Sequence, residues 1–252
     1  MSLRTLTRTA AKVVRLISGK ADPRTVRILC YHRVRKERDY LSVTPEDFEA
    51  QMKHVASLGL RTISLKEVLD GKGDSRSLVL TFDDGFLDNY DQAYPIMKRH
   101  GFTAAIFCIS SKMGTPGYLN REQILQMMKD GFEFGAHTVT HPHLPRISRE
   151  EKQAEILNSR TALEAYTGKP FDLFCYPYGE FDSDCLEILK SSGFRAACSN
   201  TPGANRAGAL GNPFLLKRTE ISGFDSLEDY DLKLAGAYDT LHSILHAVRG
   251  RP

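Results

Sequence analysis

Short apolar runs alternate with helical patterns along the chain, and this alternation limits the fold more than any other feature of the sequence. Eight of these runs are predicted strands: residues 26–32, 60–63, 78–82, 103–109, 132–136, 171–175, 194–198 and 215–221. Because the runs are apolar on both faces, we expect a parallel sheet covered by helices, in the α/β class. With about eight strands, a closed or nearly closed barrel is favoured over an open doubly wound sheet.

Capping signals mark helices between the strands. Thr44 and Pro45 begin a helix that Gly59 ends, and Ser148 begins another in capping-box spacing. The longest stretch without predicted structure, residues 200–213, is expected to be a lid or a disordered loop. No linker divides the chain, and its 252 residues fit one large domain.

The amino-terminal segment differs from the rest in charge. Residues 1–20 hold five of the 34 Lys and Arg residues and no acid, so the rest of the chain has two more acids than bases. Leucine, alanine, valine and isoleucine recur there at helical spacing. We therefore predict a basic amphipathic helix within residues 1–24 and one large domain over residues 25–252. Its basic face is predicted to be solvated, with a peripheral contact to anionic lipid through residues 1–20 as the sharper alternative.

Several classes of protein are disfavoured. The five cysteines are odd in number, widely spaced and without a CxxC pair, which argues against a disulfide framework and a thiolate zinc site. Free thiols favour a reducing compartment, so we expect a cytoplasmic location, with peripheral attachment at the inner membrane as a variant. No run approaches the roughly 18 apolar residues of a membrane span. Basic residues outside the first helix are balanced by acids, so no nucleic-acid partner is expected.

The run LVLTFDDG places Asp83 and Asp84 directly after a predicted strand. Two adjacent, partly desolvated carboxylates are costly unless a cation or a proton compensates them. Neighbouring side chains in an extended segment point in different directions, so one carboxylate could bind a metal while the other faces a substrate. A turn that caps the next helix, or a magnesium site for phosphate transfer, fits this pair alone equally well.

The run FEFGAHTVTHPHL favours a different metal. It ends a predicted strand in His137, with His141 four residues later and His143 beyond Pro142. Two imidazoles and one carboxylate are a common ligand set for zinc or iron, and imidazole disfavours a pure magnesium site. We therefore predict a divalent metal site, with Zn²⁺ as the first choice and Co, Ni or Fe as alternatives. His143 is either a further site residue or part of the rim.

The run FDLFCYPYGEFD forms a third strand end. Pro177 restricts the backbone there and Gly179 frees it, which would present Tyr178 at the rim. The Tyr178 N–H is then available for an oxyanion and its ring for the face of a sugar. A simple Pro-Tyr turn is the alternative.

The motifs TFDDG, HTVTH and YPYG, in this order, resemble the first three motifs of the polysaccharide deacetylases, carbohydrate esterase family 4, which share the NodB-homology domain. The resemblance covers about residues 26–222. It implies a deformed (β/α) barrel of seven to eight parallel strands and metal-dependent removal of acetyl groups from N-acetylated sugars. By this resemblance Asp83 is the catalytic base, Asp84, His137 and His141 are the metal ligands, and the Tyr178 amide helps to stabilise the oxyanion.

The chain departs from the family pattern at two positions. Many members have an arginine two residues before the proline of the third motif, where Cys175 stands here; Arg218 in LKRTEI is a candidate substitute partner for Asp83. The usual late Leu-x-x-His motif, which supplies the general acid, is also missing. The early run ILCYHRV resembles a circularly permuted subgroup, which makes His32 the predicted acid. Arg33 beside it is predicted to form either a salt bridge or a substrate contact.

The predicted function is removal of N-acetyl groups from a sugar or polysaccharide in cell-surface glycan biosynthesis. The partner is then an N-acetylated glycan. One alternative is deacetylation or deformylation of a lipid-linked sugar at the membrane surface, suggested by the basic helix. Another is a catalytically inactive carbohydrate-binding homologue, which the replacement at Cys175 leaves open.

Overall fold

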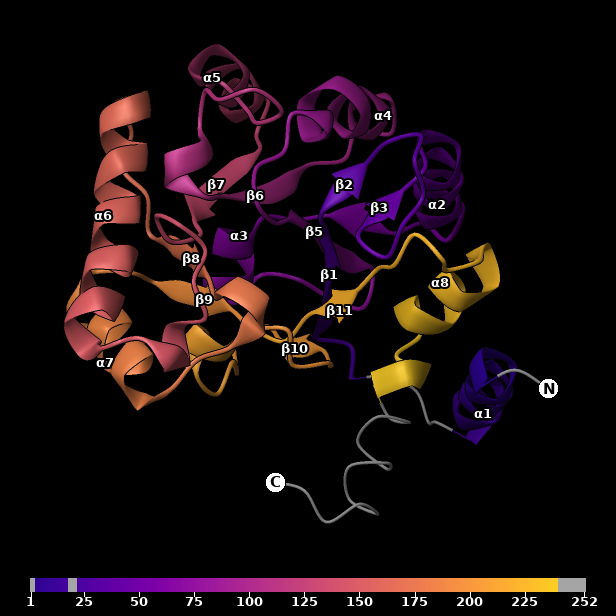
Figure 1. Cartoon of the computed structure of the whole chain (residues 1–252). Helices are drawn as coiled ribbons and strands as arrows, with labels where there is room; N and C mark the ends of the chain where they lie inside the picture. Colours follow the sequence, from indigo (N-terminus) through magenta and orange to yellow (C-terminus); the bar gives the residue numbers. More distant parts are fainter. Residues whose placement is uncertain (1–2, 18–21, 240–252) are drawn as a thin grey trace.

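The computed structural model describes residues 3–17 and 22–239, and its main sheet is curled and mostly parallel (Figure 1). Six strands follow one another in space in the order β1-β5-β6-β7-β8-β9. They are β1 (Thr25–Tyr31), β5 (Ser77–Phe82), β6 (Ala104–Cys108), β7 (Glu133–Ala136), β8 (Leu173–Cys175) and β9 (Ala196–Cys198). All neighbouring pairs in this series are parallel, so the carboxyl ends of the strands meet at one end of the sheet.

The sheet closes almost completely through one late segment. β11 (Thr219–Glu220) pairs in parallel with β1, and Leu216 just before it bridges in parallel to Cys198 of β9. The segment thus spans the gap between the two edge strands, and the prediction of a deformed (β/α) barrel is confirmed. The predicted strand over residues 215–221 is interrupted, because a 3-10 turn (Pro213–Leu215) occupies its start and the Arg218 amide donates to Thr201 O instead.

Besides β11 and β10, which is described below, three short strands lie outside this series. β4 (Arg61–Thr62) pairs with the start of β5, so the run at residues 60–63 forms an edge strand. β2 (Arg33–Val34) and β3 (Ser42–Val43) form a separate two-stranded sheet.

Helices surround the sheet and one helix fills its interior (Figure 1). They are α1 (Leu3–Ile17), α2 (Pro45–Ser57), α3 (Leu65–Leu69), α4 (Tyr94–Arg99), α5 (Arg121–Lys129), α6 (Arg149–Thr167), α7 (Ser183–Ser191) and α8 (Leu227–Leu234). Leu65 and Val68 of α3 are buried with Ile28, Val79 and Phe107 of the sheet, so α3 plugs the barrel. Predicted caps are present: the side chains of Thr44 and Ser148 accept bonds from the first turns of α2 and α6.

The basic residues of α1 face acids of α8. Arg8 forms two hydrogen bonds to the buried Asp229 (2.7 and 2.6 Å), Lys12 pairs with Glu228, and Arg15 pairs with Asp231. Arg8 is therefore tied to the protein, whereas the side chains of Lys12 and Arg15 remain 49% and 48% exposed, so this face stays partly solvated as predicted. The contact with anionic lipid stays a prediction. Among the described helices, none combines the length and the apolar character needed to cross a bilayer.

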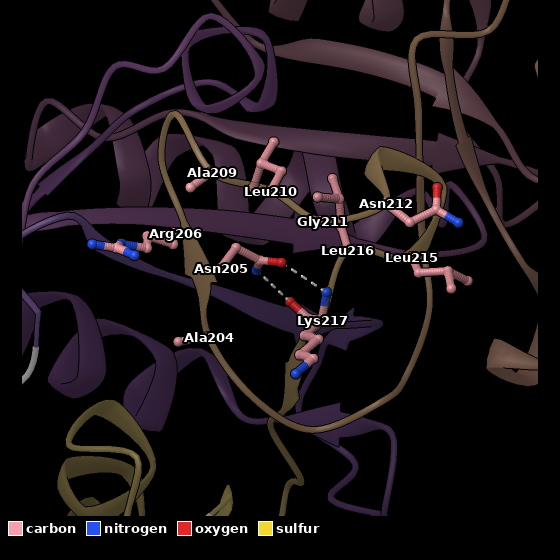
Figure 2. A pocket seen from close by; sticks show the side chains of 10 residues that line it. All are labelled: Ala204, Asn205, Arg206, Ala209, Leu210, Gly211, Asn212, Leu215, Leu216 and Lys217. Carbon is pink, nitrogen blue, oxygen red and sulfur yellow. Dashed lines mark hydrogen bonds between the residues drawn. The ribbon is translucent and has the colours of Figure 1, made fainter.

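The loop at residues 200–213 is neither a lid nor a disordered loop, so that prediction is wrong. It contains β10 (Asn205–Arg206), which pairs antiparallel with Thr25 and Val26 at the amino end of β1, away from the motif-bearing strand ends. This loop and residues 215–217 line a pocket of about 370 Å³, and Figure 2 shows the side chains around it. Beside it the Asn205 carboxamide donates to Lys217 O (2.8 Å) and accepts from Lys217 N (3.0 Å), which ties the loop to the segment carrying Arg218.

Candidate metal and catalytic site

The predicted site residues come together at the carboxyl ends of β1, β5, β7 and β8, with Arg218 entering from the closing segment. Asp84, His137 and His141 form the centre. The nearest Asp84 oxygen lies 3.5 Å from Nε2 of each histidine, and the two Nε2 atoms lie 3.2 Å apart. One donor atom from each of the three residues thus converges on a common point.

The tautomer of His137 suits metal binding. Its Nδ1 lies 2.8 Å from the carbonyl oxygen of Cys175, which can only accept a hydrogen bond, so Nδ1 carries the proton. Nε2 therefore directs its lone pair at Asp84 and His141. A backbone carbonyl behind a ligand histidine is a common way to fix ring orientation.

Burial sets the charge of this centre. It lowers the pKa of His137 to about 3 and also lowers that of His141, so both rings are neutral at pH 7. Burial raises the pKa of Asp84 to about 6, which means that the carboxylate lacks sufficient compensating charge. Two neutral imidazoles and an under-compensated carboxylate are a donor set that fits a divalent cation.

Two other groups of potential ligands share Asp83: one with Cys30 and His32, the other with His137 and Cys175. Both Asp83 oxygens already accept hydrogen bonds from the guanidinium of Arg218, so the group of ligands around Asp84 is the better metal site.

Asp83 and Arg218 form a buried bidentate pair. Nη1 donates to Oδ1 and Nη2 to Oδ2, both at 2.7 Å, and the two side chains are 3% and 0% exposed. Burial alone would raise the pKa of Asp83, but the charge and hydrogen bonds of Arg218 outweigh it and hold that pKa well below its usual range. Asp83 is therefore ionised at neutral pH and fixed in orientation.

Arg218 is itself held on several sides. Nε donates to Ser199 O (3.0 Å), Nη1 to Thr81 Oγ1 (3.1 Å), and Nη2 to Asn200 Oδ1 (2.6 Å) and Cys175 Sγ (3.1 Å). The guanidinium thus also lies against Cys175, which stands in the place of the motif arginine, while its pairing with Asp83 is the contact predicted for Arg218.

Two thiols complete the surroundings of Asp83. The Sγ atoms of Cys30 and Cys175 each lie 3.5 Å from Oδ2 of this carboxylate. Burial raises the pKa of both thiols well above the usual value, so both remain protonated and can donate weak hydrogen bonds. All five cysteines are free and buried.

His32 lies beside Asp83. Cys30 and His32 point to the same face of the extended chain, and a ring nitrogen of His32 lies within 4.8 Å of an Asp83 oxygen and of Cys30 Sγ. Its Nδ1 is buried without a hydrogen-bond partner among the residues described.

Arg33 forms the salt bridge that was one of its two predicted roles. Its Nε donates to Asp88 Oδ2 at 2.8 Å, and its guanidinium carbon lies 4.3 Å from the centre of the Phe86 ring.

Tyr178 stands at the rim, as predicted, with 52% of its surface exposed. Its ring stacks on His143 with centroids 3.9 Å apart and meets His141 edge-on at 4.6 Å. Nδ1 of His143 lies 2.8 Å from Glu180, and His143 belongs to none of the potential ligand groups among the described residues, so it supports the rim. Pro177, which precedes Tyr178, is buried.

Non-glycine residues with left-handed backbone lie only in the three motifs, within the part of the chain that the structure describes. They are Asp84, Thr138, His141 and Tyr178, with φ of 71°, 63°, 65° and 58°. Such conformations are rarely adopted by residues with a Cβ and concentrate at functional sites.

Glu155 of α6 is a site residue that sequence reasoning missed. Its Oε2 accepts from the amides of Val139 (2.8 Å) and Thr140 (2.9 Å), and its Oε1 from Thr140 Oγ1 (2.8 Å). These bonds fasten the turn between His137 and His141. Glu155 is one of several acids in a charged helix, so no sequence signal distinguishes it.

Comparison with known proteins places this geometry among relatives. The family profile described as "Polysaccharide deacetylase" matches residues 70–197. YxkH of Bacillus subtilis (strain 168), which carries the family's name, is 30% identical over 187 residues, covering 72% of this chain and 67% of that protein. A poly-beta-1,6-N-acetyl-D-glucosamine N-deacetylase of Staphylococcus aureus (strain MRSA252) is 30% identical over 200 residues, covering 66% of this chain and 69% of the relative. Among solved structures, the Streptococcus pyogenes deacetylase PplD in complex with acetate has a TM-score of 0.77 and 25% identity, covering 84% of this chain and 99% of that one.

Proposed function

The chain belongs to the polysaccharide deacetylase family, carbohydrate esterase family 4, and on that premise we propose that it hydrolyses the N-acetyl amide of a glycan with the help of a divalent metal. The observation that carries the proposal is the convergence of Asp84, His137 and His141 beside a buried, ionised Asp83. The reaction class, hydrolysis of an N-acetyl group, follows from membership of the family.

Asp84, His137 and His141 would hold the metal, with Zn²⁺ as the first choice and Co, Ni or Fe as alternatives. A cation bound there would polarise the acetyl carbonyl and make water more acidic. The support is the donor set itself, in which the His137 proton sits on the nitrogen that faces away from the other two ligands.

The remaining residues have separate roles in the proposed mechanism. Asp83, kept ionised by Arg218, takes the proton of the attacking water. The Tyr178 amide, on a backbone restricted by Pro177, donates to the oxyanion. His32 gives its proton to the departing amine, because an amine leaves poorly unless it is protonated.

The substrate we propose is a polymer of N-acetylated hexosamine. The Staphylococcus aureus relative is named for an N-acetylglucosamine polymer. The exposed Tyr178 ring, supported by His143, offers a flat apolar surface of the kind that packs on a sugar face.

No observation favours the alternatives predicted from sequence. The lipid-linked substrate was suggested by the basic amino-terminal helix, but Arg8, Lys12 and Arg15 of this helix pair with acids of α8. An inactive homologue would be expected to lack part of the machinery, whereas this chain keeps the Asp83–Arg218 pair and the convergent side chains of Asp84, His137 and His141. The cytoplasmic location stays a prediction that cell fractionation would test.

The test combines metal analysis with acetate release from chitooligosaccharides and from poly-β-1,6-N-acetylglucosamine. We expect about one metal per chain and turnover on at least one polymer. Asp83→Asn should abolish turnover and retain the metal, and His32→Ala should lose most of kcat with unchanged metal content. Bound metal without turnover on either polymer would contradict the proposal and favour a binding protein.

A further inference from the structure

Two buried polar residues follow Asp83 and Asp84 in the chain, and neither is the proposed base or a proposed metal ligand. Asp88 is 8% exposed and Asn89 is 0% exposed. Asn89 opens a short π-helix (Asn89–Ala93), a rare backbone form that is frequent at functional sites. Buried polar groups need hydrogen-bond partners, so the position of these partners shows what the two side chains do.

Their main partners are residues 32–34, directly after β1. The Asn89 carboxamide donates to His32 O (2.9 Å), and Asp88 accepts from Arg33 Nε (2.8 Å) and from Val34 N (3.1 Å). The carboxamide also lies 3.4 Å from Asp88 Oδ1, which joins the two side chains. We call this pair the Asp88–Asn89 clasp.

The clasp acts where the chain leaves the main sheet. His32 is the single residue between β1 and β2, at the point where the chain leaves the barrel for the small β2–β3 sheet. Its carbonyl is bound by Asn89, and the next two residues are bound by Asp88. The orientation of the His32 ring toward Asp83 therefore depends on this loop.

The loop that holds His32 is also the loop that carries the proposed base and one proposed metal ligand. Asp83 and Asp84 precede the clasp by only a few residues. Phe86 lies between Asp84 and the clasp, and the centre of its ring is 4.3 Å from the guanidinium carbon of Arg33. One short segment thus determines the relative positions of the proton acceptor and of His32.

From this geometry we infer that Asp88 and Asn89 are positioning residues that hold His32 in place to protonate the departing amine. The inference rests on the proposed function, in particular on the role of His32 as general acid. It also accounts for the ion pair of Arg33, which belongs to the clasp.

The test compares two acetyl substrates with different leaving groups. An N-acetylated chitooligosaccharide releases an amine, which needs a proton, whereas 4-nitrophenyl acetate releases a phenolate that departs without one. Asn89→Ala should lower kcat for acetate release from the oligosaccharide roughly 10- to 100-fold, with KM, metal content and ester hydrolysis unchanged. His32→Ala should show the same selectivity more strongly.

Asp88→Asn is the second variant, because it keeps the shape of the side chain but removes the charge that pairs with Arg33 and one of the two oxygens that accept hydrogen bonds from residues 33 and 34. It should lower the amide rate in the same selective way, and it carries the test if Asn89→Ala does not fold. The matched control is Asp91→Asn, an exposed carboxylate in the same π-helix, which should change neither rate.

The outcomes separate the inference from its premise. If His32→Ala changes the ratio of amide to ester hydrolysis and neither clasp variant does, the clasp is overturned and the proposed function stands. Equal loss of both rates in the clasp variants, together with lower thermal stability, would also overturn it. If the wild-type protein releases no acetate from the oligosaccharide, or His32→Ala leaves the ratio unchanged, the premise fails and the inference with it.

Discussion

Replacing Arg218 with methionine should cause a large loss of stability. The side chains of Arg218 and Asp83 are 0% and 3% exposed, and the variant leaves this carboxylate buried without its counter-charge. Removing one partner of a buried pair costs about 3–5 kcal/mol of unfolding free energy. For a chain of this size that corresponds to a fall in the melting temperature of roughly 6–20 °C.

The same variant should lose activity even where it is folded. Without the guanidinium, burial acts on Asp83 with little opposition and raises the pKa of its carboxyl. A carboxyl that is protonated at neutral pH cannot accept a proton from water. We therefore expect acetate release to fall at temperatures well below the melting transition.

Urea and thermal unfolding should be measured beside a matched exposed pair. Arg61 and Asp74 lie 3.0 Å apart with side chains 51% and 42% exposed, so Arg61→Met should cost only about 0–1 kcal/mol. If Arg218→Met and Arg61→Met had equal effects, the reasoning about the buried pair would be wrong. Adding Cys175→Arg to Arg218→Met should restore part of both properties, because Cys175 Sγ lies 3.1 Å from Nη2 of Arg218.

Three further predictions concern other parts of the molecule. Glu155→Gln should weaken zinc binding by the metal-free protein roughly 10- to 100-fold in a competition titration, because it loosens the ligand turn; unchanged affinity would contradict this. Burial would raise the pKa of Asp229, but hydrogen bonds led by that from Arg8 outweigh it and lower the pKa below the unfolded value of about 3.9. The stability from this pair is therefore present above about pH 4 and lost as pH falls through the lower folded-state pKa. Unfolding curves of wild type and Arg8→Gln should accordingly converge in acid, and a difference independent of pH would refute the assignment. His143→Ala should raise KM with little change in metal content, since it removes the surface on which Tyr178 stacks; a change in metal content alone would instead make His143 a ligand.

Local motifs explain why much of the site could be predicted from the sequence. Asp84, His137 and His141 each lie in a motif that ends a strand, and parallel strands bring those ends to the same edge of the sheet. Arg218 could be predicted because the replacement at Cys175 leaves the base without its usual partner, and one late strand offers an arginine.

The contacts that escaped prediction join positions far apart in the chain. Asn89 binds the carbonyl of His32, 57 residues away, and neither residue shows a pattern that points to the other. The loop at residues 200–213 was misjudged because β10 is two residues long, too short to show strand alternation. Periodicity reports which face of an element is buried, but it does not report which buried polar groups meet.

The left-handed backbone of Asp84, Thr138, His141 and Tyr178 has a consequence for engineering. A residue with a Cβ in this conformation costs about 1–2 kcal/mol, a penalty that glycine does not pay. A library of variants selected only for survival at high temperature would therefore enrich glycine at these four positions. The proposed metal ligands Asp84 and His141 and the rim residue Tyr178 would be lost. A heat-resistant catalyst from this scaffold requires selection for turnover in every round.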